Sequence, residues 1–287
     1  MTKRTITRII PAIETSDGAG VKLRRSLGQR QNLRLDPFLM LDEFYSDDPD
    51  DYIAGFPSHP HRGFETVTYM LAGHMLHEDH LGNRGHLKDG GVQWMTAGSG
   101  VIHSEMPQQN AGLLRGFQLW INLPAAAKMQ TARYVDVQAD QIPRTALRNG
   151  GEAVLLAGKV TLDGQRVSGF FNGLDGAEMA TDPIYIDLKL AANARTELRI
   201  PAGHNAFVYV YDGTASLADT ALPPSAAAIT GAGDTLDITA GNAPAGVLVL
   251  AGRPLDEPVV QYGPFVMNSQ AEIEQALRDY RDGRLTG

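Results

Sequence analysis

Two short motifs carry the side chains whose types and spacing could bind a metal ion. His59 and His61 flank a proline in "SHPH", and His103 and Glu105 flank a serine in "HSE". Residues i and i+2 of an extended segment project to the same face, so each motif presents two adjacent ligand groups. If both strands face one interior, three imidazoles and one carboxylate converge. That set suits Fe, Mn, Ni, Cu or Zn better than Ca or Mg, and a six-coordinate ion would keep two positions open.

The neighbouring polar and aromatic residues give weaker patterns. Four histidines lie in the turn-rich "GHMLHEDHLGNRGH", where solvated or turn-capping roles are favoured: His74, His77, His80 and His86. Among these four, His77 is the best candidate to contact a metal-binding side chain without binding the metal itself. For Glu65 two roles are equally compatible with the sequence, an outer metal ligand and a pocket carboxylate. Candidate pocket walls are Phe56, Phe64, Trp94 and Met95, with core packing as the alternative, above all for Trp94.

The elements that would position these residues are short strands. Runs such as "GFETVTYML", "LRGFQLWINL" and "AGVLVLAG" alternate with turns rich in Gly, Asp, Asn and Pro, which predicts an all-β barrel or sandwich. Near the end, "NSQAEIEQALRDYRDG" has Ser269 and Glu272 spaced as a capping box. Ile273, Leu277 and Tyr280 follow at helical spacing, which predicts an amphipathic helix. The polar stretch 124–150 is the expected linker between two strand-rich halves.

The two halves resemble each other. "HRGFETVTYMLAG" (61–73) aligns with "PAGHNAFVYVYDG" (201–213), and "GGVQWMTAG" (90–98) matches "AGDTLDITAG" (232–241) less closely. This order predicts two similar barrels. Arg199 and Pro201 then stand opposite His59 and His61, and neither can bind a metal. We therefore expect one metal per chain, in the N-terminal barrel.

Composition narrows the function classes. The formal net charge is −8 with eight histidines taken as neutral, and the pI is about 5.5, so no overall positive field attracts nucleic acid. No apolar run approaches the ~20 residues of a membrane span, and the start lacks the apolar block of a signal peptide. With no cysteine, any metal must be held by histidines and carboxylates. We expect a cytoplasmic protein without membrane or direct nucleic-acid contacts, and a monomer by default.

Longer segments resemble the pirin family of the cupin superfamily. The likeness lies in "FPSHPHRGFETVTYMLAG", "HLGNRGHLKDGGVQWMTAGSGVIHSEMP", "RGFQLWINLP" and the C-terminal "GRPLDEPVVQYGPFVMNSQAEIEQALRDYRDG". It implies a bicupin of two antiparallel β-barrels (double-stranded β-helix or jelly-roll) with a C-terminal α-helix. The domains would be 1–135, metal-binding, and 136–287, metal-free with the terminal helix. The implied ligands are His59, His61, His103 and Glu105, and the usual ion of the family is iron.

The resemblance implies two functions. One is a quercetinase, an oxidoreductase of the quercetin 2,3-dioxygenase type that cleaves a flavonol such as quercetin with O₂, with Glu105 as the base toward the flavonol hydroxyl. The other is a non-enzymatic, iron-dependent redox sensor that binds a protein partner, such as a transcription factor or a metabolic enzyme. The open metal positions favour the enzyme. Neither the natural substrate nor the partner follows from the sequence.

Overall fold

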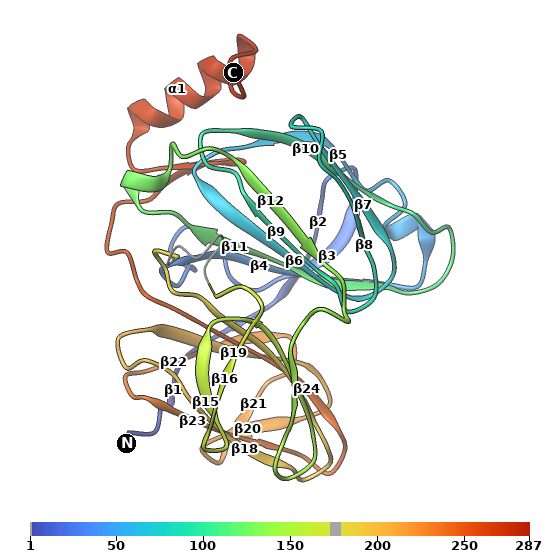
Figure 1. Ribbon diagram of the computed structural model, residues 1–287, viewed down its shortest axis with the longest axis vertical. Helices are drawn as coiled ribbons and strands as arrows, with labels where there is room; N and C mark the ends of the chain where they lie inside the picture. The colour runs from blue at the N-terminus through green and yellow to red at the C-terminus, as the bar shows by residue number, and fades with distance from the viewer. Residues whose placement is uncertain (1, 173–178) are drawn as a thin grey trace. The chain divides into compact units, whose positions relative to one another are not determined.

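The chain folds into two compact units that are both built from antiparallel sheets. The computed structural model describes residues 2–172 and 179–287. The first barrel comprises Glu14–Gly28, Phe38–Ala139 and Leu255–Gly287. The second barrel comprises Met1–Ile13, Gln29–Pro37 and Asp140–Pro254. Both units, coloured by residue number in Figure 1, are two-sheet barrels, which confirms the expected bicupin.

The first barrel consists of a seven-stranded and a four-stranded sheet. In spatial order the larger sheet is β12 (Arg133–Val137), β9 (Val92–Thr96), β6 (Phe64–Ala72), β11 (Leu114–Asn122), β4 (Phe38–Ser46), β3 (Val21–Arg25) and β2 (Ile13–Asp17). The smaller sheet is β5 (Phe56–His61), β10 (Val101–Pro107), β7 (Met75–Asp79) and β8 (Arg84–Leu87). Two short 3-10 helices, η1 (Pro49–Asp51) and η2 (Ala125–Ala127), lie in its loops.

The turn between β5 and β6 depends on a glycine. Gly63 has a positive φ of 89°, and a Cβ there would lie 2.0 Å from the carbonyl oxygen of Val266. Only glycine tolerates both the left-handed backbone and this close approach. The chain can therefore leave the small sheet directly after His61 and enter the large sheet at Phe64.

The second barrel has sheets of seven and six strands. In spatial order the first is β1 (Ile6–Pro11), β22 (Ala226–Thr230), β19 (Asn205–Asp212), β24 (Ala245–Gly252), β17 (Ile184–Leu190), β14 (Gly151–Ala157) and β13 (Arg144–Ala146). The other is β16 (Gln165–Ser168), β15 (Lys159–Leu162), β18 (Arg195–Arg199), β23 (Thr235–Ala240), β20 (Ala215–Leu217) and β21 (Thr220–Leu222). A large aliphatic cluster fills the space between them.

The strand order supports the expected duplication and corrects one of its matches. The run β9-β6-β11-β4 in the first barrel has the same order as β22-β19-β24-β17 in the second. The match of 61–73 with 201–213 therefore pairs equivalent strands, β6 and β19. The match of 90–98 with 232–241 is wrong, because β9 borders β6 whereas β23 lies in the other sheet beside β18 and β20.

The compact units differ in composition from the expected domains 1–135 and 136–287. β1 pairs with β22, so the start of the chain joins the second barrel. The end of the chain belongs to the first barrel instead of the C-terminal domain. The expected linker is largely structured, because it contains β12 at the edge of one large sheet and β13 at the edge of the other. The chain changes unit between Ala139 and Asp140.

The C-terminal segment forms a hairpin and a helix. β25 (Val260–Tyr262) pairs with β26 (Phe265–Met267), and α1 (Gln270–Arg281) follows. The predicted N-cap is present, since Ser269 Oγ accepts from the Glu272 N–H. The Glu272 carboxylate accepts from the Ser269 hydroxyl at 2.9 Å and from the Asn268 N–H at 3.1 Å, a variant of the predicted capping box. Ile273 and Ala276 form the buried face. No helix among the described residues has the length and apolar character needed to cross a membrane.

Candidate metal centre

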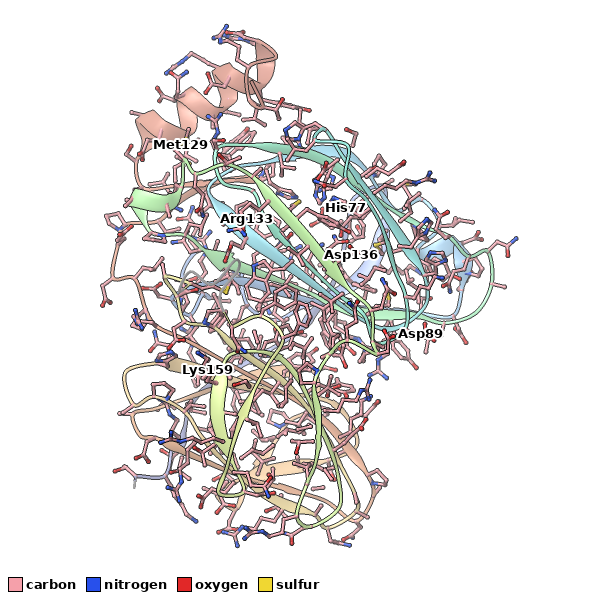
Figure 2. The ribbon with its side chains drawn as sticks, in the orientation of Figure 1. His77, Asp89, Met129, Arg133, Asp136 and Lys159 are labelled. Atoms are coloured by element: carbon pink, nitrogen blue, oxygen red, sulfur yellow. The ribbon has the colours of Figure 1, made fainter. Side chains whose placement is uncertain are left out.

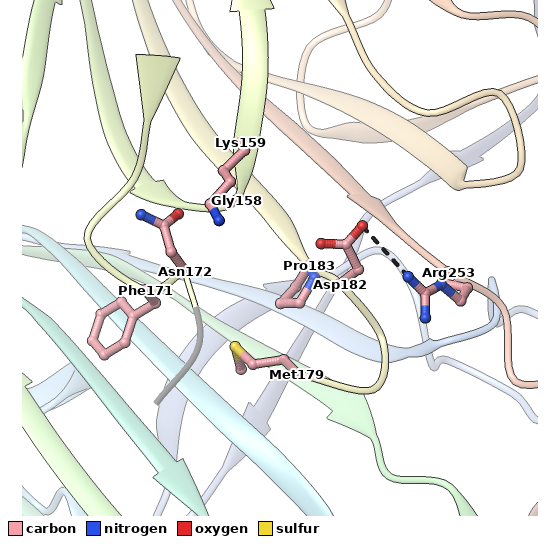
Figure 3. A pocket seen from close by; sticks show the side chains of 8 residues that line it. All are labelled: Gly158, Lys159, Phe171, Asn172, Met179, Asp182, Pro183 and Arg253. Carbon is pink, nitrogen blue, oxygen red and sulfur yellow. Dashed lines mark ion pairs between the residues drawn. The ribbon is translucent and has the colours of Figure 1, made fainter. Parts of the chain in front are cut away.

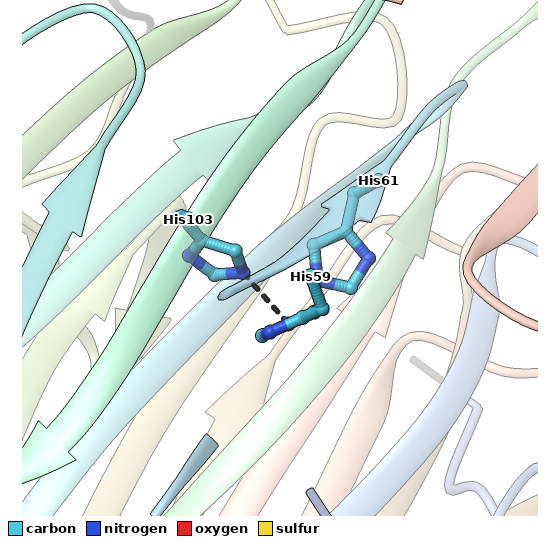
Figure 4. Close-up of side chains that lie close together, drawn as sticks. All are labelled: His59, His61 and His103. Carbon is cyan, nitrogen blue, oxygen red and sulfur yellow. Dashed lines mark hydrogen bonds between the residues drawn. The ribbon is translucent and has the colours of Figure 1, made fainter. Parts of the chain in front are cut away.

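The two histidine motifs lie on neighbouring strands. β5 and β10 pair antiparallel, with His103 opposite His59 and Val101 opposite His61. This register brings His59 Nε2 and His103 Nε2 to 3.0 Å of each other, as the dashed line in Figure 4 shows. The ring centroid of His61 lies 4.7 Å from that of His59 and 4.9 Å from that of His103. Three imidazoles thus converge on one point inside the first barrel.

The donor set fits a transition-metal ion. One ligand nitrogen from each of His59, His61 and His103 lies within 4.8 Å of the other two. Nitrogens that each bind one ion at about 2.1 Å lie about 3.0–4.2 Å apart, and the 3.0 Å between His59 Nε2 and His103 Nε2 falls in that range. Burial, reinforced by the neighbouring imidazoles, holds the pKa values of His61 and His103 well below the usual range. Both rings are therefore neutral at pH 7, the form in which histidine binds metals.

Glu105 lies in the same interior but is held by amide groups. Its side chain is buried, and Oε1 accepts from Gln93 Nε2 at 2.7 Å while Oε2 accepts from Gln118 Nε2 at 2.9 Å. Thr68 Oγ1 lies 3.3 Å from Oε1. Glu105 is not among the residues whose ligand atoms lie within 4.8 Å of one another. Its role as the fourth ligand therefore stays a prediction.

Two polar residues of this interior were not predicted from the sequence. Gln93 and Gln118 each stand alone among apolar residues, in "GVQWMT" and "GFQLWI". A lone amide in a buried strand needs a hydrogen-bond partner. The alternation of side chains along each strand, compared with the position of the His-x-Glu motif, could have indicated Glu105 as that partner. Both glutamines point toward Glu105 because Trp94 and Leu119, their neighbours in sequence, occupy the opposite face of the strand.

The other candidates divide between the cluster and its surroundings. Phe64, an expected pocket wall, packs edge-on against His61 with ring centroids 5.1 Å apart, and so does Trp120, which was not predicted, at 5.4 Å. Glu65 does not join the cluster, because Thr96 Oγ1 donates to its Oε1 at 2.7 Å and burial raises its pKa. His77 is fully buried and lies beside His103.

The remaining sequence candidates lie at or near the surface or in apolar packing. His74 Nε2 and His86 Nδ1 are 2.8 Å apart at an exposed site. The backbone N–H of Ile102 donates to His80 Nδ1 at 3.3 Å, also at an exposed site. Met95 joins an apolar cluster with Ala97 and Val101. Phe56 is partly buried against another such cluster.

The second barrel presents other side chains at the corresponding strands. On β18 and β23, Leu198 pairs with Leu236, and both belong to the aliphatic cluster. Arg199 does not face this interior, since its Nε donates to Glu197 Oε1 at 3.0 Å on the outside. His204 Nε2 lies 3.0 Å from Asp182 Oδ2.

Asp182 also lines a surface cavity of the second barrel. The cavity has a volume of about 210 Å³, and Lys159 and Arg253 are among its lining residues, as Figure 3 shows. It differs in chemistry from the histidine cluster, because two cations line it. Within residues 2–172 and 179–287, the group of side chains that could hold a metal ion is the histidine cluster of the first barrel, and none of its members lines this cavity.

Two antiparallel barrels on one chain define the protein as a bicupin, and three imidazoles converge in one of them. Models of the Pirin family and of the Pirin C-terminal cupin domain match residues 20–121 and 185–286. The chain therefore belongs to the pirin family, as its motifs indicated.

Similar proteins span nearly the whole chain. A Pseudomonas aeruginosa protein provisionally named as a quercetin 2,3-dioxygenase is 53% identical over 273 residues, 94% of each chain. Human pirin is 36% identical, and the match covers 98% of this chain and 93% of that protein. A crystal structure of quercetin 2,3-dioxygenase from Acinetobacter baumannii has a TM-score of 0.84 and 33% identity, with 99% of each chain covered.

Proposed function

We propose that the protein binds one divalent transition metal, with iron preferred over Mn, Ni, Cu and Zn, and acts as a flavonol dioxygenase of the quercetin 2,3-dioxygenase type. The convergence of three imidazoles, of which His61 and His103 are buried and neutral, carries the proposal. The relatives named as quercetin 2,3-dioxygenases support its substrate class. His59, His61 and His103 would hold the ion, with Glu105 as the fourth ligand.

The surrounding residues suit this chemistry. A bound metal would supply a Lewis-acid and redox centre for the flavonol oxygen and O₂. His59 is only partly buried, whereas His61 and His103 are buried, so substrate would approach from the side of His59. Glu105 would accept the flavonol hydroxyl proton at a carboxylate oxygen. Gln93 and Gln118 fix the orientation of that carboxylate, and Phe64 and Trp120 exclude water around His61.

The test combines metal analysis with oxygen uptake. Protein purified without oxygen should contain one equivalent of metal and consume O₂ when quercetin is added. Glu105→Gln could still coordinate through its amide oxygen but could not accept the proton. We expect its turnover to fall by ~10²–10⁴ even after metal is resupplied. In this variant the new amide N–H faces Gln93 or Gln118, which are both donors, and this clash can displace the side chain. The metal content of the variant must therefore be measured in parallel.

Fully metal-loaded wild-type protein that consumes no O₂ with quercetin would rule out the dioxygenase. The regulatory role would then remain. It predicts little turnover in either form, and a change in the iron reduction potential in Glu105→Gln, because loss of an anionic ligand favours Fe(II) over Fe(III).

A further inference from the structure

A chain of buried polar side chains leads from His103 away from the proposed metal. His103 Nε2 faces His59, and on the other side of the ring His103 Nδ1 lies 3.3 Å from His77 Nδ1. The second nitrogen of His77, Nε2, lies 3.4 Å from Asp79 Oδ2. His77 comes from β7, the strand beside β10, and lies within the first barrel (Figure 2). The Tyr134 ring stacks on it with centroids 4.1 Å apart and an interplanar angle of 15°, which fixes its plane.

The partners of His77 determine which of its nitrogens carries hydrogen. A carboxylate only accepts, so Asp79 requires a hydrogen on His77 Nε2. Asp79 is itself fixed, since its Oδ1 accepts the backbone N–H groups of Leu81 and Asn83 and its Oδ2 accepts from Asn83 Nδ2. With Nε2 protonated, neutral His77 has an acceptor lone pair at Nδ1.

Gln93 requires the same assignment independently. Tyr134 Oη donates to Gln93 Oε1 at 3.3 Å, so the Gln93 amide nitrogen points the other way. That nitrogen donates one hydrogen to Glu105 Oε1 and lies 3.3 Å from His77 Nδ1. The second hydrogen of that nitrogen points to His77 Nδ1, whose single lone pair it shares with the His103 ring, also 3.3 Å away. Asp79 and Gln93, at opposite ends of the ring, both select the Nε2–H tautomer of His77.

We propose that Asp79 and His77 are positioning residues that hold His103 in its Nδ1–H tautomer. Because His77 Nδ1 is an acceptor, neutral His103 gains a hydrogen bond by placing its own hydrogen on Nδ1. The Nε2 lone pair of His103 then points toward His59 and His61, where a metal would bind. Ligating histidines commonly donate their other ring N–H to a fixed acceptor in this way. The inference deepens the proposed function, because it rests on the same metal site.

Asp79→Asn is the sharpest test, because it changes hydrogen bonding with almost no change in shape. The side-chain oxygen of the new amide can keep the backbone N–H groups of Leu81 and Asn83, which leaves the amide nitrogen facing His77 Nε2 and the Asn83 side-chain amide. His77 can accept from that nitrogen at Nε2 only by placing its hydrogen on Nδ1, where it meets the Gln93 N–H. The variant therefore weakens the selection of the His77 Nε2–H tautomer and raises the share of His103 in the Nε2–H tautomer, whose Nε2 cannot bind metal. We expect Co(II) affinity, measured by chelator competition, to fall 10–100-fold.

Two variants of His77 separate positioning from packing. His77→Gln can still accept from His103 through its amide oxygen and should retain Co(II) affinity near that of wild type. His77→Leu has no acceptor and should lose affinity. His86→Ala, at an exposed histidine, is the matched control and should bind as wild type does. Thermal unfolding of each metal-free variant shows whether a loss reflects unfolding.

The His103 tautomer gives a readout that needs no metal. His59 Nδ1 donates to the Pro57 carbonyl, so His59 Nε2 is an acceptor 3.0 Å from His103 Nε2 and competes for the His103 hydrogen when no metal is bound. Nitrogen-15 NMR of metal-free protein should therefore show a population of His103 protonated at Nδ1 in wild type and a smaller one in Asp79→Asn. An unchanged tautomer, or Co(II) affinity within twofold of wild type in folded Asp79→Asn, would overturn the inference. Wild type that binds no Co(II) while its tautomer responds as described would instead refute the proposed metal site and leave the positioning role in place.

Discussion

Lys128 is a buried cation held by neutral oxygen atoms. Its ammonium donates to the Gly63 carbonyl at 2.7 Å, to Asn122 Oδ1 at 2.6 Å and to the Val266 carbonyl at 3.0 Å. Gly63 follows the His-x-His motif by two residues, and Val266 lies in β26. One side chain therefore joins the β5–β6 turn to the C-terminal hairpin. The three acceptors match the three N–H groups of the ammonium.

Lys128 should give the stability of the protein an alkaline pH dependence. Burial lowers its pKa to about 8 from an ordinary value of 10.5, against the weaker opposing effect of Glu257 and Glu272. Between these two pH values the unfolded chain binds more protons than the folded one, so the free energy of unfolding contributed by this group rises with pH. Urea unfolding at pH 7.5–10 should show the rise in wild type and not in Lys128→Met. Parallel curves for the two proteins would contradict this assignment.

The sequence predicted the residues of the site that carry recognisable chemistry. Histidines two apart on a strand predict a shared face from backbone geometry alone. Gln93, Gln118 and Asp79 could not be selected in this way, because their role depends on which strands become neighbours. His77 was singled out, but its spacing to His103 has no local meaning. Their contact exists because β7 pairs with β10.

At the scale of elements, the C-terminal segment stabilises the end of the strand that carries His59 and His61. The Arg62 N–H donates to the Pro264 carbonyl, and the Val266 N–H donates back to the Arg62 carbonyl. The Arg62 side chain is 4% exposed and pairs with Asp279 of α1 at 2.7 Å. It also donates to the carbonyls of Ser99 and Leu285. The helix therefore anchors the residue that directly follows His61.

Asp279→Ala should destabilise the first barrel. It leaves the Arg62 guanidinium with carbonyl partners only, and we expect a loss of about 1–2 kcal/mol in unfolding free energy at pH 7, since Asp279 is partly exposed. Arg62 holds the pKa of Asp279 below its usual range. The stabilisation is therefore present above about pH 4, and it disappears as pH falls through the folded-state pKa. Denaturant unfolding at pH 7 and pH 3 measures both effects.

Glu274→Ala is the matched control for this helix, because Glu274 is exposed on α1. Its unfolding free energy should equal that of wild type within about 0.5 kcal/mol, as for ordinary surface substitutions. A loss as large as that of Asp279→Ala would show that helix content, and not the ion pair, sets the effect.

Elements were predicted where their signals are local. The helix followed from Ser269 and Glu272, but Leu277 and Tyr280, expected on its apolar face, are 37% and 43% exposed. The β6 and β19 segments were matched correctly because both are central strands with the same buried pattern. The wrong match of β9 with β23 relied on a shared "TAG" ending, which records turn chemistry and not sheet position.

At the scale of the whole molecule, the two barrels share strand order and differ in what fills them. The second barrel packs Leu198, Leu236 and Ile238 at β18 and β23, whereas the first places three imidazoles and Glu105 at β5 and β10. Aliphatic packing needs no ligand for stability, while a buried polar cluster gains most from an ion that binds it. Composition alone could not predict which segments join each unit. The start of the chain joins the second barrel and its end joins the first, and both assignments depend on long-range pairing.

Metal binding should therefore protect one barrel only. We expect one equivalent of Co(II) per chain, and at a free concentration of about 100 times the dissociation constant it should stabilise the folded first barrel by about 2.7 kcal/mol. Amides of β5 and β10 that exchange by opening the site should then exchange about 100-fold more slowly, while those of β19 and β24 keep their rates. His103→Ala should abolish both the bound metal and the protection. Two equivalents of tightly bound metal in wild type, with one surviving in His103→Ala, would place a second site outside the histidine cluster and contradict the division between the barrels.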